Sequence, residues 1–186
     1  MIQEQQLPVV AFKRGQTLDN SVWYMNSLLT FYAESKDTGG SFQVGEWLGK
    51  PGNEPPPHVH ELEHEFFYVL EREIDAYIGS DVFRVAKGEC LLIPKNMPHT
   101  FLIRTPRYRM LFFTQPCGLD KYMRAMAAEP ALELDFPKKG IPYSASDIQH
   151  AIDEGLKYGL RFLSPEEIRE QLPAYPGMAS PEERNS

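Results

Sequence analysis

Three histidines and one glutamate have the spacing of metal ligands that come from neighbouring β-strands. His58 and His60 are two residues apart, so in an extended segment their side chains point to the same face. Glu65 lies an odd number of residues beyond His60 and must enter from the next strand after a turn, while His99 comes from a distant segment. Three imidazoles and one carboxylate suit a single divalent ion of Fe, Mn, Co, Ni, Cu or Zn. Structural zinc sites usually use thiolates, so we expect an open site with a free position for water or substrate.

The residues around these ligands indicate how the chain presents them. Three prolines, at positions 55 to 57, favour an extended approach to His58, because proline fixes φ and moves the preceding residue out of the helical region. The polar segment from Glu61 to His64 then has to turn or bulge, and we expect Glu61 and Glu63 to be solvated there. His64 and His150 are expected at the surface.

A competing motif overlaps the same residues. His60, Glu61 and His64 match the His-Glu-x-x-His pattern of zinc metalloproteases, in which a helix places both histidines on one face. The preceding prolines and the aromatic, β-branched residues that follow disfavour a helix here, and no third-ligand motif follows. We therefore expect a strand and a site of a different kind.

The elements that must position these ligands are short strands. We expect a strand region at 21–34 and strands at 41–48, 65–71, 74–78, 82–85, 90–93, 99–104 and 108–114, separated by turn residues such as those at 79–81. Short strands at close intervals are typical of a sandwich or a barrel. After Pro116 the pattern becomes helical, with helices expected at 119–127, from about Ser146, and at a capping box that runs from Ser164 to Glu167.

Composition limits the class of protein. The chain has 186 residues, a size typical of one domain, with 42% hydrophobic and 24% charged residues. A net charge of −7 argues against nucleic acid or an anionic membrane as partner. We expect no signal peptide and no membrane span, because the start lacks a basic and apolar pattern and no run of about 20 apolar residues occurs. Cys90 is expected to be a small core residue, and the two cysteines fit a reducing, cytoplasmic setting.

We divide the chain into four segments: an N-terminal edge strand or arm (1–19), a β-barrel (20–116), a C-terminal helical segment (117–172) and a loose tail (173–186). The stretch from Leu7 to Phe12 reads as the edge strand. Because an exposed edge invites pairing with another chain, we expect a homodimer.

The ligand pattern resembles the two motifs of the cupin superfamily. Gly52, His58, His60 and Glu65 fit the first motif, with Arg72 in place of its final glycine. Gly88, Pro94 and His99 fit the second motif, with Asn96 in place of glycine and Ile103 in place of asparagine. The resemblance implies an all-β dominated fold, a single jelly-roll-type cupin barrel followed by short helices. Asn tolerates the left-handed conformation that the turn needs, whereas Arg72 suggests that the bend after Glu71 needs no positive φ.

Within the cupins, the segments 28–33, 55–60 and 65–71 look like the quercetin 2,3-dioxygenase-like subgroup. This resemblance implies a metal-dependent dioxygenase that acts with O₂ on an aromatic enol such as a flavonol, with Glu65 as both metal ligand and proton acceptor. Phe67 lies two residues beyond Glu65 and Phe101 two beyond His99, so each shares its ligand's face. We expect Phe67, Phe101 and Ile103 to line an apolar substrate cavity, with plain barrel core as the alternative for the two rings.

Two other functions remain open from the sequence. One is a non-catalytic cupin that binds a small ligand. The other is a sugar isomerase or epimerase, which an apolar lining disfavours because sugars need polar partners.

Overall fold

Strands dominate the structure, a computed structural model that describes residues 9–127, 129–141 and 143–177. The strands are β1 (Ser21–Tyr24), β2 (Ser27–Ala33), β3 (Gln43–Gly49), β4 (His58–His60), β5 (His64–Glu71), β6 (Glu73–Ile78), β7 (Asp81–Ala86), β8 (Cys90–Ile93), β9 (His99–Ile103), β10 (Tyr108–Gln115), β11 (Glu129–Pro130) and β12 (Leu160–Phe162). The helices are α1 (Ser35–Thr38), α2 (Leu119–Ala125), α3 (Ala145–Lys157) and α4 (Pro165–Gln171). The strands and the late helices that the sequence predicts are therefore present.

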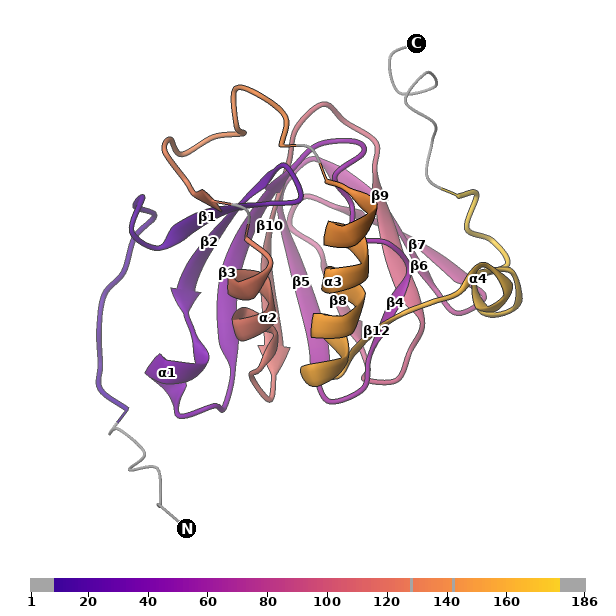
Figure 1. Cartoon of the computed structure of the whole chain (residues 1–186), viewed down its shortest axis with the longest axis horizontal. Coiled ribbons are helices and arrows are strands. Elements are labelled where there is room, and N and C mark those ends of the chain that lie inside the picture. Colours follow the sequence, from indigo (N-terminus) through magenta and orange to yellow (C-terminus); the bar gives the residue numbers. More distant parts are fainter. Residues whose placement is uncertain (1–8, 128, 142, 178–186) are drawn as a thin grey trace.

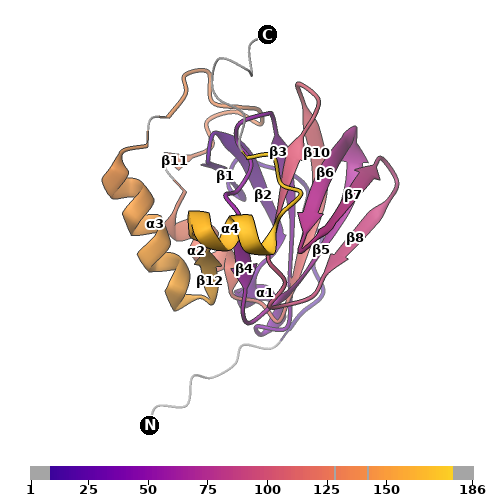
Figure 2. The ribbon, with the colours of Figure 1, turned by 90° about the vertical axis from the view of Figure 1, so that its right-hand side faces the viewer.

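Two antiparallel sheets enclose the core (Figures 1 and 2). One has the order β11-β1-β2-β3-β10-β5-β8, and the other has the order β12-β4-β9-β6-β7. α3 and α4 lie outside the sheets, on the side where β12 joins β4 (Figure 2). This jelly-roll-type barrel confirms the fold class expected from the sequence.

The inner faces of the two sheets are aromatic and closely packed. Phe31, Phe101, Tyr108 and Phe112 are among the largest fully buried side chains. Gly45 in β3 is required by this packing, because a Cβ there would lie 2.3 Å from Cζ of Phe112. Burial of these rings stabilises the barrel, since each removes a large apolar area from water.

Three local expectations are corrected. The strand region at 21–34 is a hairpin, because Met25 and Asn26 adopt positive φ values of 50° and 58° between β1 and β2. Arg72 also has a positive φ, of 70°, so the bend before β6 keeps the conformation that favours glycine, and our expectation from the substitution was wrong. Cys90 is exposed rather than buried in the core. Asn96, at φ 65°, keeps its turn as expected.

The structure differs from the sequence-based expectation at the N-terminal end of the chain. Residues 9–12 form no strand, and residues 7 and 8 lie outside the described residues. Residues 9–12 therefore offer no edge strand through which two chains could pair. The homodimer stays a prediction, as do the four segment boundaries. In the described part of the tail, 173–177, neither helix nor strand occurs. No helix within the described ranges is long and apolar enough to cross a bilayer.

Candidate metal centre

The strand β4 presents two histidines to the barrel interior. The prolines before it hold the chain extended, and β4 pairs with β12 on one side and β9 on the other. His58 and His60 are both buried and share one face of this strand. His99, at the start of β9, is the direct cross-strand partner of His58. Three histidines thus reach one place from two neighbouring strands.

Glu65 enters from the opposite sheet. The chain turns at 61–63 and starts β5, where alternate residues face inward and outward. Glu65 and Phe67 are buried on the inner face, whereas His64 and Tyr68 are exposed on the outer face. Since His60 ends one strand and His64 begins another, the metalloprotease helix is excluded.

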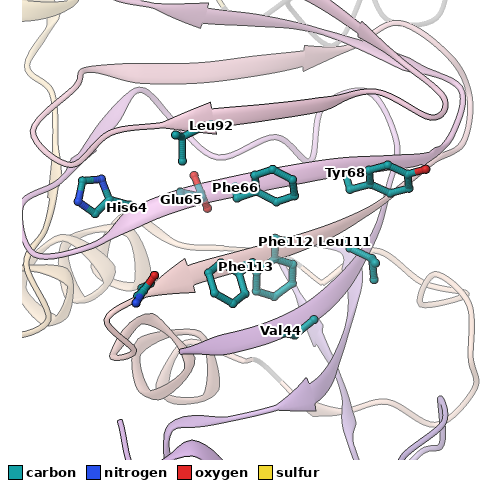
Figure 3. A pocket seen from close by; sticks show the side chains of 10 residues that line it. Val44, His64, Glu65, Phe66, Tyr68, Leu92, Leu111, Phe112 and Phe113 are labelled. Atoms are coloured by element: carbon teal, nitrogen blue, oxygen red, sulfur yellow. The ribbon is translucent and has the colours of Figure 1, made fainter. Parts of the chain in front are cut away.

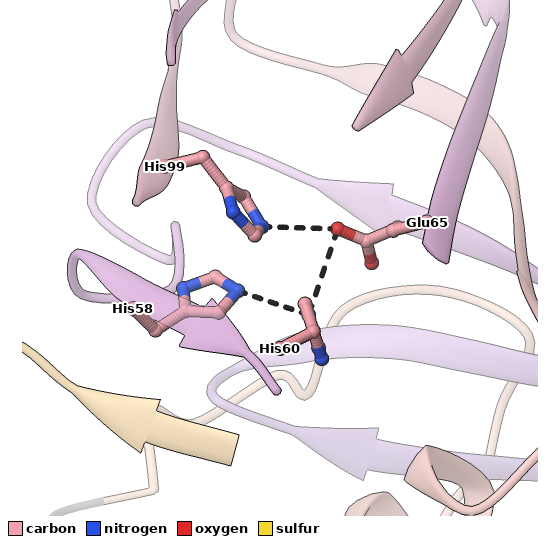
Figure 4. Close-up of side chains that lie close together, drawn as sticks. All are labelled: His58, His60, Glu65 and His99. Atoms are coloured by element: carbon pink, nitrogen blue, oxygen red, sulfur yellow. Dashed lines mark hydrogen bonds and ion pairs between the residues drawn. The ribbon is translucent and has the colours of Figure 1, made fainter. Parts of the chain in front are cut away.

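The four side chains converge closely (Figure 4). Their ligand atoms all lie within 4.8 Å of one another. Nε2 of His58 is 3.2 Å from Nε2 of His60, and Nε2 of His99 is 3.2 Å from Oε2 of Glu65. The same carboxylate oxygen is 3.7 Å from Nε2 of His60. This arrangement of three Nε2 atoms around one carboxylate fits a metal site.

The far nitrogen of two histidines is fixed by the backbone. Nδ1 of His58 lies 2.8 Å from the carbonyl oxygen of Pro56, and Nδ1 of His99 lies 2.8 Å from that of Met97. A carbonyl only accepts, so each Nδ1 carries the proton and donates it, and each Nε2 keeps a lone pair directed at the centre. Metal-binding histidines are usually oriented in this way.

The charges of the cluster also suit a cation. Burial lowers the pKa of His58 well below its usual value, with His99 and His60 adding to the effect, so this imidazole is neutral. Burial raises the pKa of Glu65, but the neighbouring His60 and His99 outweigh it, so the pKa is lowered and the carboxylate is ionised. Burial lowers the pKa of His60, but Glu65 and Glu63 outweigh it, so this pKa is raised. An ionised, buried carboxylate among three imidazoles provides the charge and the donor types that a divalent transition metal needs.

A small cavity of about 30 Å³ adjoins the cluster. Phe67 and Phe101 line it, as expected, but Ile103 does not. Ile103 shares the inner face of β9 with Phe101, but four residues of strand place it ~13 Å along the barrel from His99. There its Cδ1 would lie 2.8 Å from a Cβ at Gly49.

Most of the cavity wall was not found by sequence reasoning. The further lining residues come from β1, β3, α2 and β12 and from the segment before β4: Tyr24, Trp47, Pro55, Leu119, Tyr122, Met123, Leu160 and Phe162. None of them has a fixed spacing to the ligands, so no pattern in the sequence points to them. Glu63 was assigned to a solvated loop, yet it is 2% exposed and lies beside His60. Nothing in its spacing indicated burial.

A larger concavity of about 540 Å³ lies on the outer face of β3, β10, β5 and β8 (Figure 3). Its side chains are mostly apolar and include Val44, Phe66, Leu92 and Leu111, with His64 at one end. The four polar side chains that converge on one point meet in the barrel interior, on the inner side of this sheet. Chemistry therefore belongs to the inner cavity.

Comparison with known proteins agrees with this geometry. Residues 46–114 match the family model described as a cupin domain, so this segment is a cupin domain. Its ends fall in β3 and β10, and it contains all four residues of the cluster.

A curated relative and two solved structures show further similarity. Quercetin 2,3-dioxygenase from Bacillus subtilis (strain 168) is 23% identical over 121 residues, which are 65% of this chain and 34% of the relative. The chain therefore spans about a third of that protein's length. KdgF from Halomonas has 16% identity and a TM-score of 0.46, covering 52% of this chain and 85% of that chain. Pac13, a nucleoside dehydratase from Streptomyces, has 16% identity and a TM-score of 0.46, covering 56% of this chain and 83% of that chain.

Proposed function

We propose that this chain is a metal-dependent dioxygenase that acts on an aromatic enol of the flavonol type. The observation that carries the proposal is the convergence of His58, His60, Glu65 and His99 beside a cavity lined by aromatic rings. Similarity to a quercetin 2,3-dioxygenase supports this choice among the activities of metal-binding barrels. The match of residues 46–114 to a cupin domain and the buried cluster that fits a metal ion support the broader assignment of a metal-binding cupin.

The three imidazoles and Glu65 would hold one divalent ion of Fe, Mn, Co, Ni, Cu or Zn. When bound, a redox-capable ion of this kind supplies Lewis acidity toward the enol oxygen and electron exchange with O₂. The protein's own contribution is to fix the lone pairs of the imidazoles and to exclude water with the surrounding rings.

Glu65 would have a second role as proton acceptor. A carboxylate that binds a cation through one oxygen keeps the other oxygen free to accept the proton of a substrate hydroxyl. Glu65 is 6% exposed and lines the same cavity as Phe67 and Phe101, so the proton transfer takes place away from bulk water.

The cavity walls would orient and admit the substrate. Phe67, Phe101 and Phe162 offer aromatic rings for a flat substrate, and the indole of Trp47 adds to the same wall. A volume of about 30 Å³ holds little more than one water molecule. A flavonol therefore enters only when side chains of α2 or β12, such as Tyr122 and Phe162, move aside.

Neither alternative function has a specific observation in its favour. A non-catalytic small-ligand-binding cupin would use the same cavity, and turnover distinguishes it from the enzyme. A sugar isomerase or epimerase needs several polar side chains around the substrate, and the lining is largely aromatic and aliphatic. The homodimer and the cytoplasmic setting stay predictions, which sedimentation equilibrium and cell fractionation can measure.

Oxygen consumption by the metal-loaded protein tests the proposal. The metal-free chain is loaded with each of the six ions and supplied with a panel of flavonols and smaller enols. We expect O₂ uptake that matches substrate loss, with both atoms of ¹⁸O₂ in the product, for at least one ion. Metal-free protein is the control. One bound ion per chain without O₂ uptake on any substrate would contradict the proposed activity.

A further inference from the structure

Glu63 is a buried carboxylate between the cluster and α2. Its side chain is 3% exposed, whereas that of its neighbour Glu61 is 49% exposed. Oε1 of Glu63 accepts a hydrogen bond of 2.8 Å from the backbone N–H of Leu119, at the start of α2. Its other oxygen, Oε2, lies 3.6 Å from Nδ1 of His60. An ionisable group is rarely buried so fully without a specific role for its charge.

His60 differs from the other two histidines in what its far nitrogen meets. Nδ1 of His58 and Nδ1 of His99 each have a backbone carbonyl at 2.8 Å. Nδ1 of His60 has no partner within hydrogen-bond distance among the described residues, and the acidic oxygen that faces it belongs to Glu63. The gap of 3.6 Å is within the reach of a small rotation of the imidazole.

We infer that Glu63 is the positioning residue of His60 and that it ties α2 to the metal centre. The inference rests on the proposed metal site. A carboxylate beside Nδ1–H fixes the tautomer with a lone pair on Nε2, keeps the ring directed at the ion and makes the imidazole a stronger donor. Backbone carbonyls do this for His58 and His99, so the cluster has one ligand that depends on a side chain.

The contact with α2 joins the ligand to the cavity wall. Leu119, Tyr122 and Met123 of this helix all line the cavity. Gly118, just before the helix, allows the close approach, because a Cβ there would lie 3.0 Å from Oε1 of Glu63. One carboxylate therefore fixes both the orientation of His60 and the position of α2, the helix that closes the cavity.

The substitution Glu63→Gln separates these roles from simple packing. A carboxylate has an acceptor oxygen for each of its two donors, but an amide has only one, so glutamine turns its NH₂ toward either Leu119 or His60. We expect the affinity for Co²⁺, measured by competition with a chelator, to fall ~10–100-fold. We also expect the visible absorption spectrum of the bound Co²⁺ to change, which a purely structural role would not cause. Glu61→Gln, the exposed neighbour, is the matched control and keeps both properties.

A second variant tests the inference if the first does not fold. Gly118→Ala leaves every proposed ligand unchanged but presses on Oε1 of Glu63, so it should weaken Co²⁺ binding in the same direction by a smaller factor. Should Glu63→Gln fail to fold, this variant decides the question. Wild-type affinity and spectrum in a folded Glu63→Gln, or in Gly118→Ala when the first is unfolded, would overturn the inference. Absence of Co²⁺ binding by the wild-type chain would instead refute the metal centre.

Discussion

Replacing His99 with alanine should abolish the increase in melting temperature that metal gives the wild-type chain. The four ligands come from β4 and β9 in one sheet and β5 in the other, so they meet only in the folded chain. A ligand that binds only the folded state, at a concentration 100 times its Kd, stabilises by ~2.7 kcal/mol. For a domain of this size each kcal/mol raises Tm by ~2–4 °C, so loading the wild type should raise it by ~5–11 °C.

The substitution also has an effect that is independent of metal. His99 is 1% exposed, and its removal leaves the backbone carbonyl of Met97 without its donor. An unsatisfied buried acceptor costs ~1–3 kcal/mol, so Tm should fall by ~2–12 °C even without metal. The informative quantity is therefore the difference between melting scans of one variant with and without the ion.

Differential scanning calorimetry with and without a saturating divalent ion measures this difference. His150→Ala is the control, because this histidine is exposed on α3 and should leave the full metal-dependent rise. A metal-dependent rise in His99→Ala as large as in the wild type would refute the reasoning, because the ion would then bind elsewhere.

Two further outcomes are expected. Glu65→Gln should lower the turnover of the metal-loaded enzyme by ~10²–10⁴-fold at saturating metal, because an amide cannot accept the substrate proton; oxygen-electrode kinetics measure this, and a change of less than a few-fold would exclude the role as base. The pKa of Asp75 is raised by burial but lowered more by its hydrogen bonds to Arg84 and Arg104, so its stabilising effect is present above the unfolded-state pKa of ~3.9 and is lost as pH falls through the lower folded-state value. Urea unfolding should therefore show a smaller loss of stability on acidification for Asp75→Asn than for the wild type, and equal losses would contradict this.

The shared face of His58 and His60 could be predicted because its information is local. Alternation along a strand puts His58 and His60 on one face, and the prolines before them make the strand. The capping box at Ser164 likewise identifies the start of α4, since the pattern depends on residues three positions apart. Features of this kind need no knowledge of how distant segments meet.

The errors at the candidate site concern residues whose environment is set by distant segments. Glu63 looks like a surface residue until α2, more than fifty residues later in the chain, brings the N–H of Leu119 to it. Ile103 has the periodicity of a lining residue, but its distance along β9 removes it from the cavity. The cavity residues from β12 reach the site because Leu160–Phe162 pairs with β4. No spacing in the sequence predicts this pairing.

The most direct test of the metal centre is an anomalous diffraction experiment on crystals of the chain loaded with one of the six ions. Data collected on both sides of the absorption edge of that ion locate it without reference to the rest of the structure. The account predicts one strong peak per chain, within ~2.0–2.2 Å of Nε2 of His58, His60 and His99 and of one Glu65 oxygen. A peak elsewhere in the chain, or a loaded crystal with none at this cluster, would contradict it.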